Sequence, residues 1–238
     1  MAIAQKNRTG ATDPVAGGFY TVREAARLLN IGNHARVTAW LQGHKRSKAG
    51  PVLQRQYEVI SSTQEIGFWD LLEIRFVDHF RAAGVSLPTL RKAAQVARRE
   101  WKQQHPFATS KAKYFTDRKN IFRSTAEEEK DTVLYNLVTR QLEMYEVIEN
   151  FIDKGLRFDV TSGLAEEWVP RAKEFPNIVV NPLLAYGKPA ILPAGVPTSA
   201  IFQTWKAEDG SYAAVADWYG IDGAMAREAV EFELGLPN

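Results

Sequence analysis

The run YTVREAARLLNIGNHARVTAWL, residues 20–41, decides how the first part of this 238-residue chain folds. Thr21 is a good helix N-cap, and Glu24 three residues later completes a capping box. Apolar residues then recur at helical spacing until the turn Asn30-Ile31-Gly32, in which the glycine can adopt a positive φ. The pattern predicts a short helix that ends at this turn.

A second short helix follows the turn. Asn33 caps it, and its inward face consists of Val37, Trp40 and Leu41. Two short helices joined by a three-residue turn form a helix-turn-helix, whose second helix can enter a DNA major groove.

A basic turn comes next. Residues 42–51 are rich in glycine and cations, and residues 52–57 have strand character. Together they predict a β-wing, which would place cations along the phosphate backbone beside the groove. Two further helices are expected over residues 68–80 and 88–102, with Trp40 and Trp69 in the core.

These features nominate DNA-contacting residues. For the groove we expect contacts from the second helix, namely His34, Arg36 and Thr38. For the phosphates we expect five cations: Arg23, Lys45, Arg46, Lys48 and Arg55. A single one of these cations is as readily explained as a solvated surface charge, whereas the cluster favours a polyanion.

The charge distribution agrees with this interpretation. The net charge of +2 combines residues 1–113, with 18 Lys and Arg against 8 Asp and Glu, and residues 114–238, with 12 against 20. No acidic residue occurs between Ala25 and Tyr57. The asymmetry suggests a polyanion for the first half and another partner for the second, although the two halves attracting each other is an alternative.

Residues 19–102 resemble the winged helix-turn-helix head of MerR-type regulators, in the run quoted above and in FWDLLEIRFVDHFRAAGVSLPTLRKAAQVA. That family usually has Arg-Tyr where this chain has Thr38-Ala39, and it continues into a long dimerising helix that Gln103-Gln104-His105-Pro106 would stop early. These departures, and the absence of cysteine, argue against a metal or drug sensor.

The middle of the chain carries little chemistry. Residues 113–116 and 120–123 predict a small hairpin, and the acidic run 127–131 predicts a solvated loop or helix start rather than a metal site. A helix is expected over 138–152, and a second hairpin pairs 156–159 with 167–170.

The last part predicts two short strands and three helices. The strands are 178–182 and 187–192, and the helices run from 196 to about 206, from 212 to 219 and from 224 to 234. The last helix carries Glu228, Glu231 and Glu233 against Arg227 alone. Because phosphates would repel such a face, we interpret this part as a protein-contact element.

The segment NPLLAYGKPAIL followed by GVPTSAIFQTWKAEDGSYAAVADWYGIDGAMAREAVEFEL resembles a short bacterial domain that recurs among antitoxins. With the MerR-like head, the order resembles long-chain VapB-type antitoxins of VapBC toxin–antitoxin systems, whose partners are PIN-domain ribonucleases. The resemblance implies a cognate PIN-domain toxin with clustered carboxylates that hold a metal ion. The candidate toxin contacts are four cations: Arg171, Lys173, Lys188 and Arg227.

No pattern supports an enzyme or a cofactor. The four histidines show no paired metal-ligand spacing, and no nucleophile elbow, P-loop or dinucleotide fingerprint occurs. His79, beside two phenylalanines, is expected at the core boundary. Zero cysteines, no signal peptide and no apolar run long enough to cross a bilayer lead us to expect a cytoplasmic protein with no membrane partner.

Together these observations predict a mainly α fold with small β elements (α+β). The expected parts are a flexible lead over 1–18, a winged helix-turn-helix over 19–104, a connector over 105–175 and a helical domain over 176–238. One functional hypothesis is an antitoxin that represses its own operon by binding double-stranded operator DNA and neutralises its toxin. The other is a stand-alone regulator whose acidic half senses a ligand or dimerises. Both imply at least a homodimer, because one head reads only a half-site, and the first allows a higher hetero-oligomer.

Overall fold

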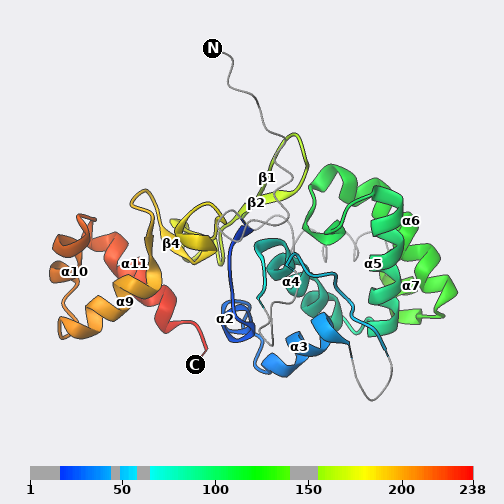
Figure 1. The fold of residues 1–238 in the computed structure, drawn as a ribbon, viewed down its shortest axis with the longest axis horizontal. Helices are drawn as coiled ribbons and strands as arrows, with labels where there is room; N and C mark the ends of the chain where they lie inside the picture. The colour runs from blue at the N-terminus through cyan, green and yellow to red at the C-terminus, as the bar shows by residue number, and fades with distance from the viewer. Residues whose placement is uncertain (1–16, 44–48, 58–64, 140–154, 238) are drawn as a thin grey trace, which may run out of the picture.

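The chain folds as a mainly α protein with small antiparallel sheets. The structure is a computed structural model, and it describes residues 17–43, 49–57, 65–139 and 155–237. The helices of the first part are α2 (Val22–Leu28), α3 (His34–Gln42), α4 (Phe68–Ala82), α5 (Leu87–Trp101), α6 (Lys111–Glu128) and α7 (Thr132–Thr139), with a 3₁₀ turn η1 (Pro106–Ala108). In Figure 1, α5, α6 and α7 lie at one end of the molecule, and α2, α3 and α4 lie in the middle.

Helix α4 is the centre of the first part. Its apolar side chains, from Phe68 to Phe80, are almost all fully buried, and even Asp70 and Glu73 are inaccessible to solvent. Trp40 is buried as expected, and Trp69 is partly buried with its indole nitrogen donating to the Ala165 carbonyl at 2.9 Å. The four helices predicted for this part are confirmed as α2, α3, α4 and α5, and so are the N-caps Thr21 of α2 and Asn33 of α3.

A stack of phenylalanine rings joins α4 to the middle of the chain. Phe76 lies 4.0 Å from Phe107 and 4.4 Å from Phe80 between ring centroids, and Phe122 of α6 lies 5.5 Å from Phe80. The predicted hairpin over 113–123 is wrong, because this stretch belongs to the 18-residue helix α6. Burial of Phe122 against distant rings overrides the β-propensity of the local sequence.

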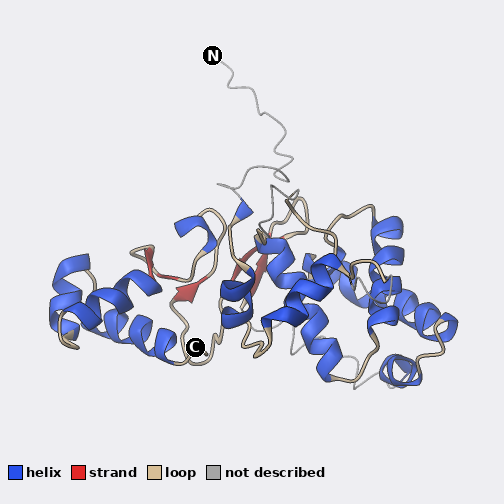
Figure 2. Cartoon of the chain, turned by 60° about the horizontal axis from the view of Figure 1, so that its bottom comes forward, coloured by secondary structure: helices blue, strands red, loops and turns tan. Residues whose placement is uncertain are grey.

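Two small sheets follow, and they lie between the helical ends (Figure 2). The strands are β1 (Leu156–Phe158), β2 (Ala165–Trp168), β3 (Ile178–Val179), β4 (Ala190–Ile191) and β5 (Val196–Pro197). β1 pairs with β2 antiparallel, and the second sheet has the order β3-β4-β5. A bridge between Trp168 and Val180 links the two sheets. The predicted hairpin is confirmed, and the two predicted strands of the last part are present but shorter than predicted, since β3 and β4 have two residues each.

The C-terminal part ends in three helices with their own core. After the 3₁₀ turn η2 (Ala185–Gly187) come α9 (Thr198–Ala207), α10 (Tyr212–Tyr219) and α11 (Gly223–Leu234), as predicted. Their core is built around Ile201, Val215 and Phe232, while Leu28 of α2 packs against both this core and that of the first part. Figure 1 shows these helices at the opposite end of the molecule from α5 to α7.

Three further predictions have three different outcomes. Residues 52–57 do not form the predicted strand of a wing; Val52 and Leu53 are instead buried, with their N–H groups donating to the Trp40 carbonyl. Most of the helix predicted over 138–152 lies outside the described residues. At the end of the acidic run, Asp131 starts α7 by accepting from the Leu134 N–H, as expected for a helix start.

In the part of the chain that the structure describes, no helix combines the length and apolar character needed to cross a membrane.

Candidate nucleic-acid interface

Local hydrogen bonds start α2, and a left-handed residue forms the turn that follows it. The Thr21 hydroxyl accepts from the Glu24 N–H, and the Glu24 carboxylate accepts in return from the Thr21 N–H at 2.8 Å. The left-handed residue of the turn is Asn30, with φ of 56°, and not Gly32 as the sequence suggested. Asparagine tolerates this conformation better than other residues with a Cβ, so the turn keeps its shape without glycine.

Helix α3 buries one face and exposes the other. Val37, Trp40 and Leu41 pack into the core. His34 is exposed, and Thr38, one turn later, is partly exposed with its hydroxyl directed to the His34 carbonyl. No acidic residue lies in the helix, so its outer face and its N-terminus carry nothing that would repel phosphate.

Arg36 lies on the flank of α3. Its guanidinium is 3.3 Å from the carboxylate of Asp78 on α4 and 5.2 Å from the centre of the Trp40 ring. The side chain is still 48% exposed. Since an exposed ion pair of this kind is worth little, Arg36 can exchange Asp78 for a phosphate at small cost.

The basic loop leaves α3 at Gly43 and returns beside it. Gly43 has φ of 79°, and a Cβ there would lie 2.3 Å from the Ala49 carbonyl oxygen, so only glycine lets the two ends of the loop meet. The loop cations Lys45, Arg46 and Lys48 lie outside the described residues. At the foot of the loop, Arg91 of α5 donates to the Gly50 carbonyl at 2.9 Å.

Arg91 is a cation that no sequence pattern nominated for this interface. It lies on α5, 41 residues after Gly50 in the sequence. Nothing local in the sequence indicates that α5 supports the loop.

Arg55 does not belong to the candidate interface. Its side chain is only 10% exposed, and it donates to the Glu65 carbonyl at 2.6 Å with the Glu65 carboxylate 3.9 Å away. The prediction of a phosphate contact at Arg55 is therefore wrong, because the guanidinium is used to hold the segment before α4. Arg23, by contrast, is exposed on α2.

Buried polar side chains form a cluster around α4. Asp70 accepts from the N–H groups of Gln56 and Gly67, and His105 lies 3.3 Å from the Glu73 carboxylate. Burial raises the pKa of Asp70 to about 6, although His105 and the two N–H groups act in the opposite direction. Burial acts to lower the pKa of His105, but Glu73 and Asp70 outweigh it and raise that pKa.

The C-terminal domain is fastened directly to α2. The Arg27 guanidinium donates to the buried Glu233 carboxylate at 2.9 Å and to the Pro237 carbonyl at 3.1 Å. The Tyr20 hydroxyl donates to the Gly187 carbonyl. The ammonium of the next residue in sequence, Lys188, lies 3.6 Å from the Glu24 carboxylate. The two halves of the chain thus attract each other at this junction.

This junction corrects the view of α11 as an acidic face. Glu233 is buried between Arg27 and the Thr198 hydroxyl, which donates to it at 2.6 Å. Glu228 accepts from the backbone and side chain of Asn177. Of the three glutamates, Glu231 is the one that stays exposed without such a bond.

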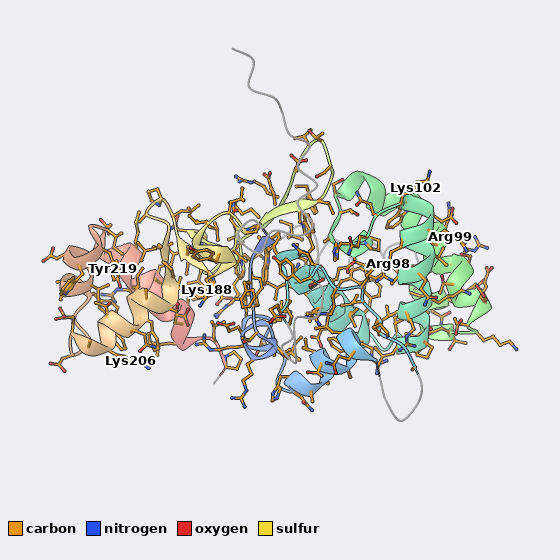
Figure 3. All side chains as sticks on the ribbon, viewed as in Figure 1. Arg98, Arg99, Lys102, Lys188, Lys206 and Tyr219 are labelled. Carbon is orange, nitrogen blue, oxygen red and sulfur yellow. The ribbon has the colours of Figure 1, made fainter. Side chains whose placement is uncertain are left out.

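The four cations nominated for a toxin are exposed but dispersed. Arg171 and Lys173 line one cavity, whereas Lys188 faces α2 and Arg227 lies over the Tyr212 ring at 4.8 Å. In Figure 3, Lys188 lies beside the middle of the molecule and Lys206 lies further out in the C-terminal domain. His79 is partly buried against the edge of the Phe80 ring, as expected. Among the described residues, no group of three or more His, Asp or Glu is arranged to hold a metal ion.

Comparison with known proteins gives a likeness in fold. No protein-family model matches the chain, and no curated protein matches it. The chain is similar to the X-ray crystal structure of Rv2018 from Mycobacterium tuberculosis, with a TM-score of 0.68 and 23% sequence identity. The likeness covers 89% of this chain and 96% of that one. At this identity it establishes a shared fold along nearly the whole length.

Proposed function

We propose that the chain is a DNA-binding antitoxin, which represses its own operon through the helix-turn-helix and neutralises a PIN-domain ribonuclease through its C-terminal half. The observation that carries the DNA-binding part is the outer face of α3. This face is solvent-exposed and free of acidic residues, and it presents His34 and Thr38 one helical turn apart.

The surroundings of α3 support the same function. Arg23 lies exposed on α2, Arg36 flanks α3, and the basic loop that starts at Gly43 follows directly. Cations placed around a recognition helix fix its register on the phosphate backbone, while the helix itself contacts base edges.

The toxin-binding part rests on the resemblance of the C-terminal half to antitoxin domains. The exposed cations Arg171, Lys173, Lys188 and Arg227 are the proposed contacts, because a carboxylate-lined metal site is neutralised by an inserted cation or by occlusion. Some of these cations already have partners within the chain, such as Glu24 beside Lys188. Toxin binding would exchange such exposed pairs for new ones.

The proposal is tested by co-expression with the product of the neighbouring gene, where that gene encodes a small protein with dispersed aspartates. We expect the two proteins to elute as one complex from a sizing column, and the complex to lack ribonuclease activity and to shift duplex DNA from upstream of the operon. A chain that elutes alone and leaves the ribonuclease active would contradict the antitoxin assignment.

A variant separates the two activities. The double substitution His34→Ala and Thr38→Ala removes both side chains from the exposed face of α3 without touching the core. We expect it to abolish the preference for operator DNA and to leave toxin neutralisation unchanged.

A stand-alone transcription regulator is the second candidate. The observation that favours it is the direct hydrogen bonding of the C-terminal domain to α2, through Arg27 and Glu233. Through this contact, a change in the C-terminal domain would alter the helix-turn-helix without a toxin. Normal operator binding in a strain that lacks the neighbouring gene, with no inhibition of any ribonuclease, is the outcome that this candidate predicts.

A further inference from the structure

A cavity of about 590 Å³ lies where the head, the middle of the chain and the C-terminal end meet. Residues 28–30, at the turn between α2 and α3, form one wall. Trp168 at the end of β2 and the turn 170–174 form another, and residues 235–237 complete it. Its volume falls within the range of small-molecule sites, about 300–1,000 Å³.

The charge of the cavity lining is predominantly positive. Arg75, Arg171 and Lys173 contribute cations, and Glu174 contributes the one carboxylate among the described lining residues. Glu174 is paired with Arg171 at 2.5 Å, but its side chain is 60% exposed. An incoming anion therefore competes with a weak, solvated pair for the Arg171 guanidinium.

Both arginines are held in place by aromatic rings. The Arg75 guanidinium lies 5.2 Å from the centre of the buried Trp168 ring, and Arg171 lies 4.5 Å from the centre of the Phe175 ring. Contact with a ring restricts the orientation of a guanidinium, whose planar set of N–H groups suits phosphate and carboxylate oxygens.

Burial lowers the pKa of Arg75 to about 10, so the group remains cationic at neutral pH in surroundings that penalise its charge. A bound anion would add a favourable interaction for this charge.

We propose that this cavity binds a small metabolite that bears phosphate or carboxylate groups. Arg75 and Arg171 supply the directional donors and Lys173 adds charge at the rim. Because Leu28, Leu29 and Asn30 form one wall, an occupant also contacts the turn of the helix-turn-helix. The proposal does not rest on the DNA or toxin partners, although Arg171 and Lys173 are also among the proposed toxin contacts.

The test is isothermal titration calorimetry of the full chain with pyrophosphate and with citrate. We expect saturable binding of at least one probe with a Kd at or below about 1 mM. Binding of pyrophosphate alone identifies a phosphorylated metabolite, and binding of citrate alone identifies a carboxylate. Absence of saturable binding by either probe overturns the proposal.

A matched pair of variants locates the binding. Arg171→Gln with Lys173→Gln removes two exposed cations of the cavity, and we expect it to weaken binding by about tenfold or more. Lys206→Gln removes an exposed cation that lies over Phe202, outside the cavity lining, and should leave the affinity unchanged. Equal weakening by both variants would show binding to general surface charge and would overturn the proposal.

Discussion

At the scale of single residues, Arg55 shows how burial changes the meaning of a charge. In the sequence it stands in a stretch without acidic residues and looks like a phosphate contact. In the structure its side chain is 10% exposed and bonded to Glu65. Its partner lies ten residues later, beyond the basic stretch, so composition alone could not place the arginine in the interior.

Replacement of Arg55 tests this structural role. We expect Arg55→Ala to lower the free energy of unfolding by about 1–3 kcal/mol, because the Glu65 carbonyl loses its donor. DNA affinity should not change in conditions where the variant is folded. Urea unfolding and fluorescence anisotropy measure the two quantities, and a stable variant with weakened DNA binding would return Arg55 to the interface.

The buried pair Asp70 and His105 makes stability depend on pH. Both groups have a pKa above the ordinary value, so the folded chain binds protons more readily than the unfolded chain. Asp70 therefore contributes a loss of stability as pH rises from about 4 to about 6, and His105 a further loss as pH rises above about 6.5 through its folded pKa.

We expect the free energy of unfolding to fall between about pH 6 and about pH 8, where His105 loses its proton in the folded chain. His105→Gln should flatten this decline, since the substituted amide does not titrate. Urea unfolding across the pH range provides the measurement. A wild-type stability that rises over this interval would contradict the assignment.

At the scale of elements, the sequence predicted what local bonds determine. The capping box at Thr21 and Glu24 and the cap at Asn33 are short-range, and the helices that they start were correctly placed. The predictions failed where contacts between residues far apart in the sequence determine the secondary structure. Phe122 packs against phenylalanine rings of α4 and η1, and the stretch predicted as a hairpin is therefore the helix α6.

The candidate site shows the same division. The exposed face of α3 follows from helical spacing and was predictable. The support of the loop by Arg91 and the cluster around Asp70 come from α4, α5 and η1, which meet only in the folded chain. No local sequence pattern predicts such contacts.

Two glycines that flank α3 offer a matched test of this account. A Cβ at Gly43 would lie 2.3 Å from the Ala49 carbonyl, whereas nothing lies within 4 Å of a Cβ at Gly32. We expect Gly43→Ala to lower the free energy of unfolding by at least about 1 kcal/mol and to weaken DNA binding, because the two ends of the loop cannot meet.

Gly32→Ala should leave stability unchanged or raise it by up to about 1 kcal/mol, since alanine restricts the unfolded chain. Thermal unfolding compares the two variants. If Gly32→Ala proved the more damaging substitution, the backbone described for the helix-turn-helix would be incorrect.

At the scale of the whole molecule, the head and the C-terminal domain form one connected body. Arg27 reaches Glu233 and the Pro237 carbonyl, and Leu28 packs on both cores. Some of the charges that make the chain asymmetric therefore join its two halves, and others remain exposed.

Substitutions at the junction should differ in their cost. Arg27→Ala leaves Glu233, with a side chain only 4% exposed, without its cation, and we expect a loss of about 2–3 kcal/mol in the free energy of unfolding. Lys188→Ala breaks the exposed pair with Glu24 and should cost less than about 1 kcal/mol. Equal costs in chemical denaturation would show that the Arg27 contact does not hold the two domains together.

The salt dependence of binding to operator DNA tests the central claim most directly. The slope in a plot of log affinity against log salt concentration should be about −4 to −5, because five cations are proposed to contact DNA. They are Arg23, Arg36, Lys45, Arg46 and Lys48. The triple substitution of Lys45, Arg46 and Lys48 by alanine should reduce the steepness by about 3 and weaken binding to all sequences alike. A full-length chain that does not bind duplex DNA even at low ionic strength, or whose affinity ignores salt and the triple substitution, would contradict the account.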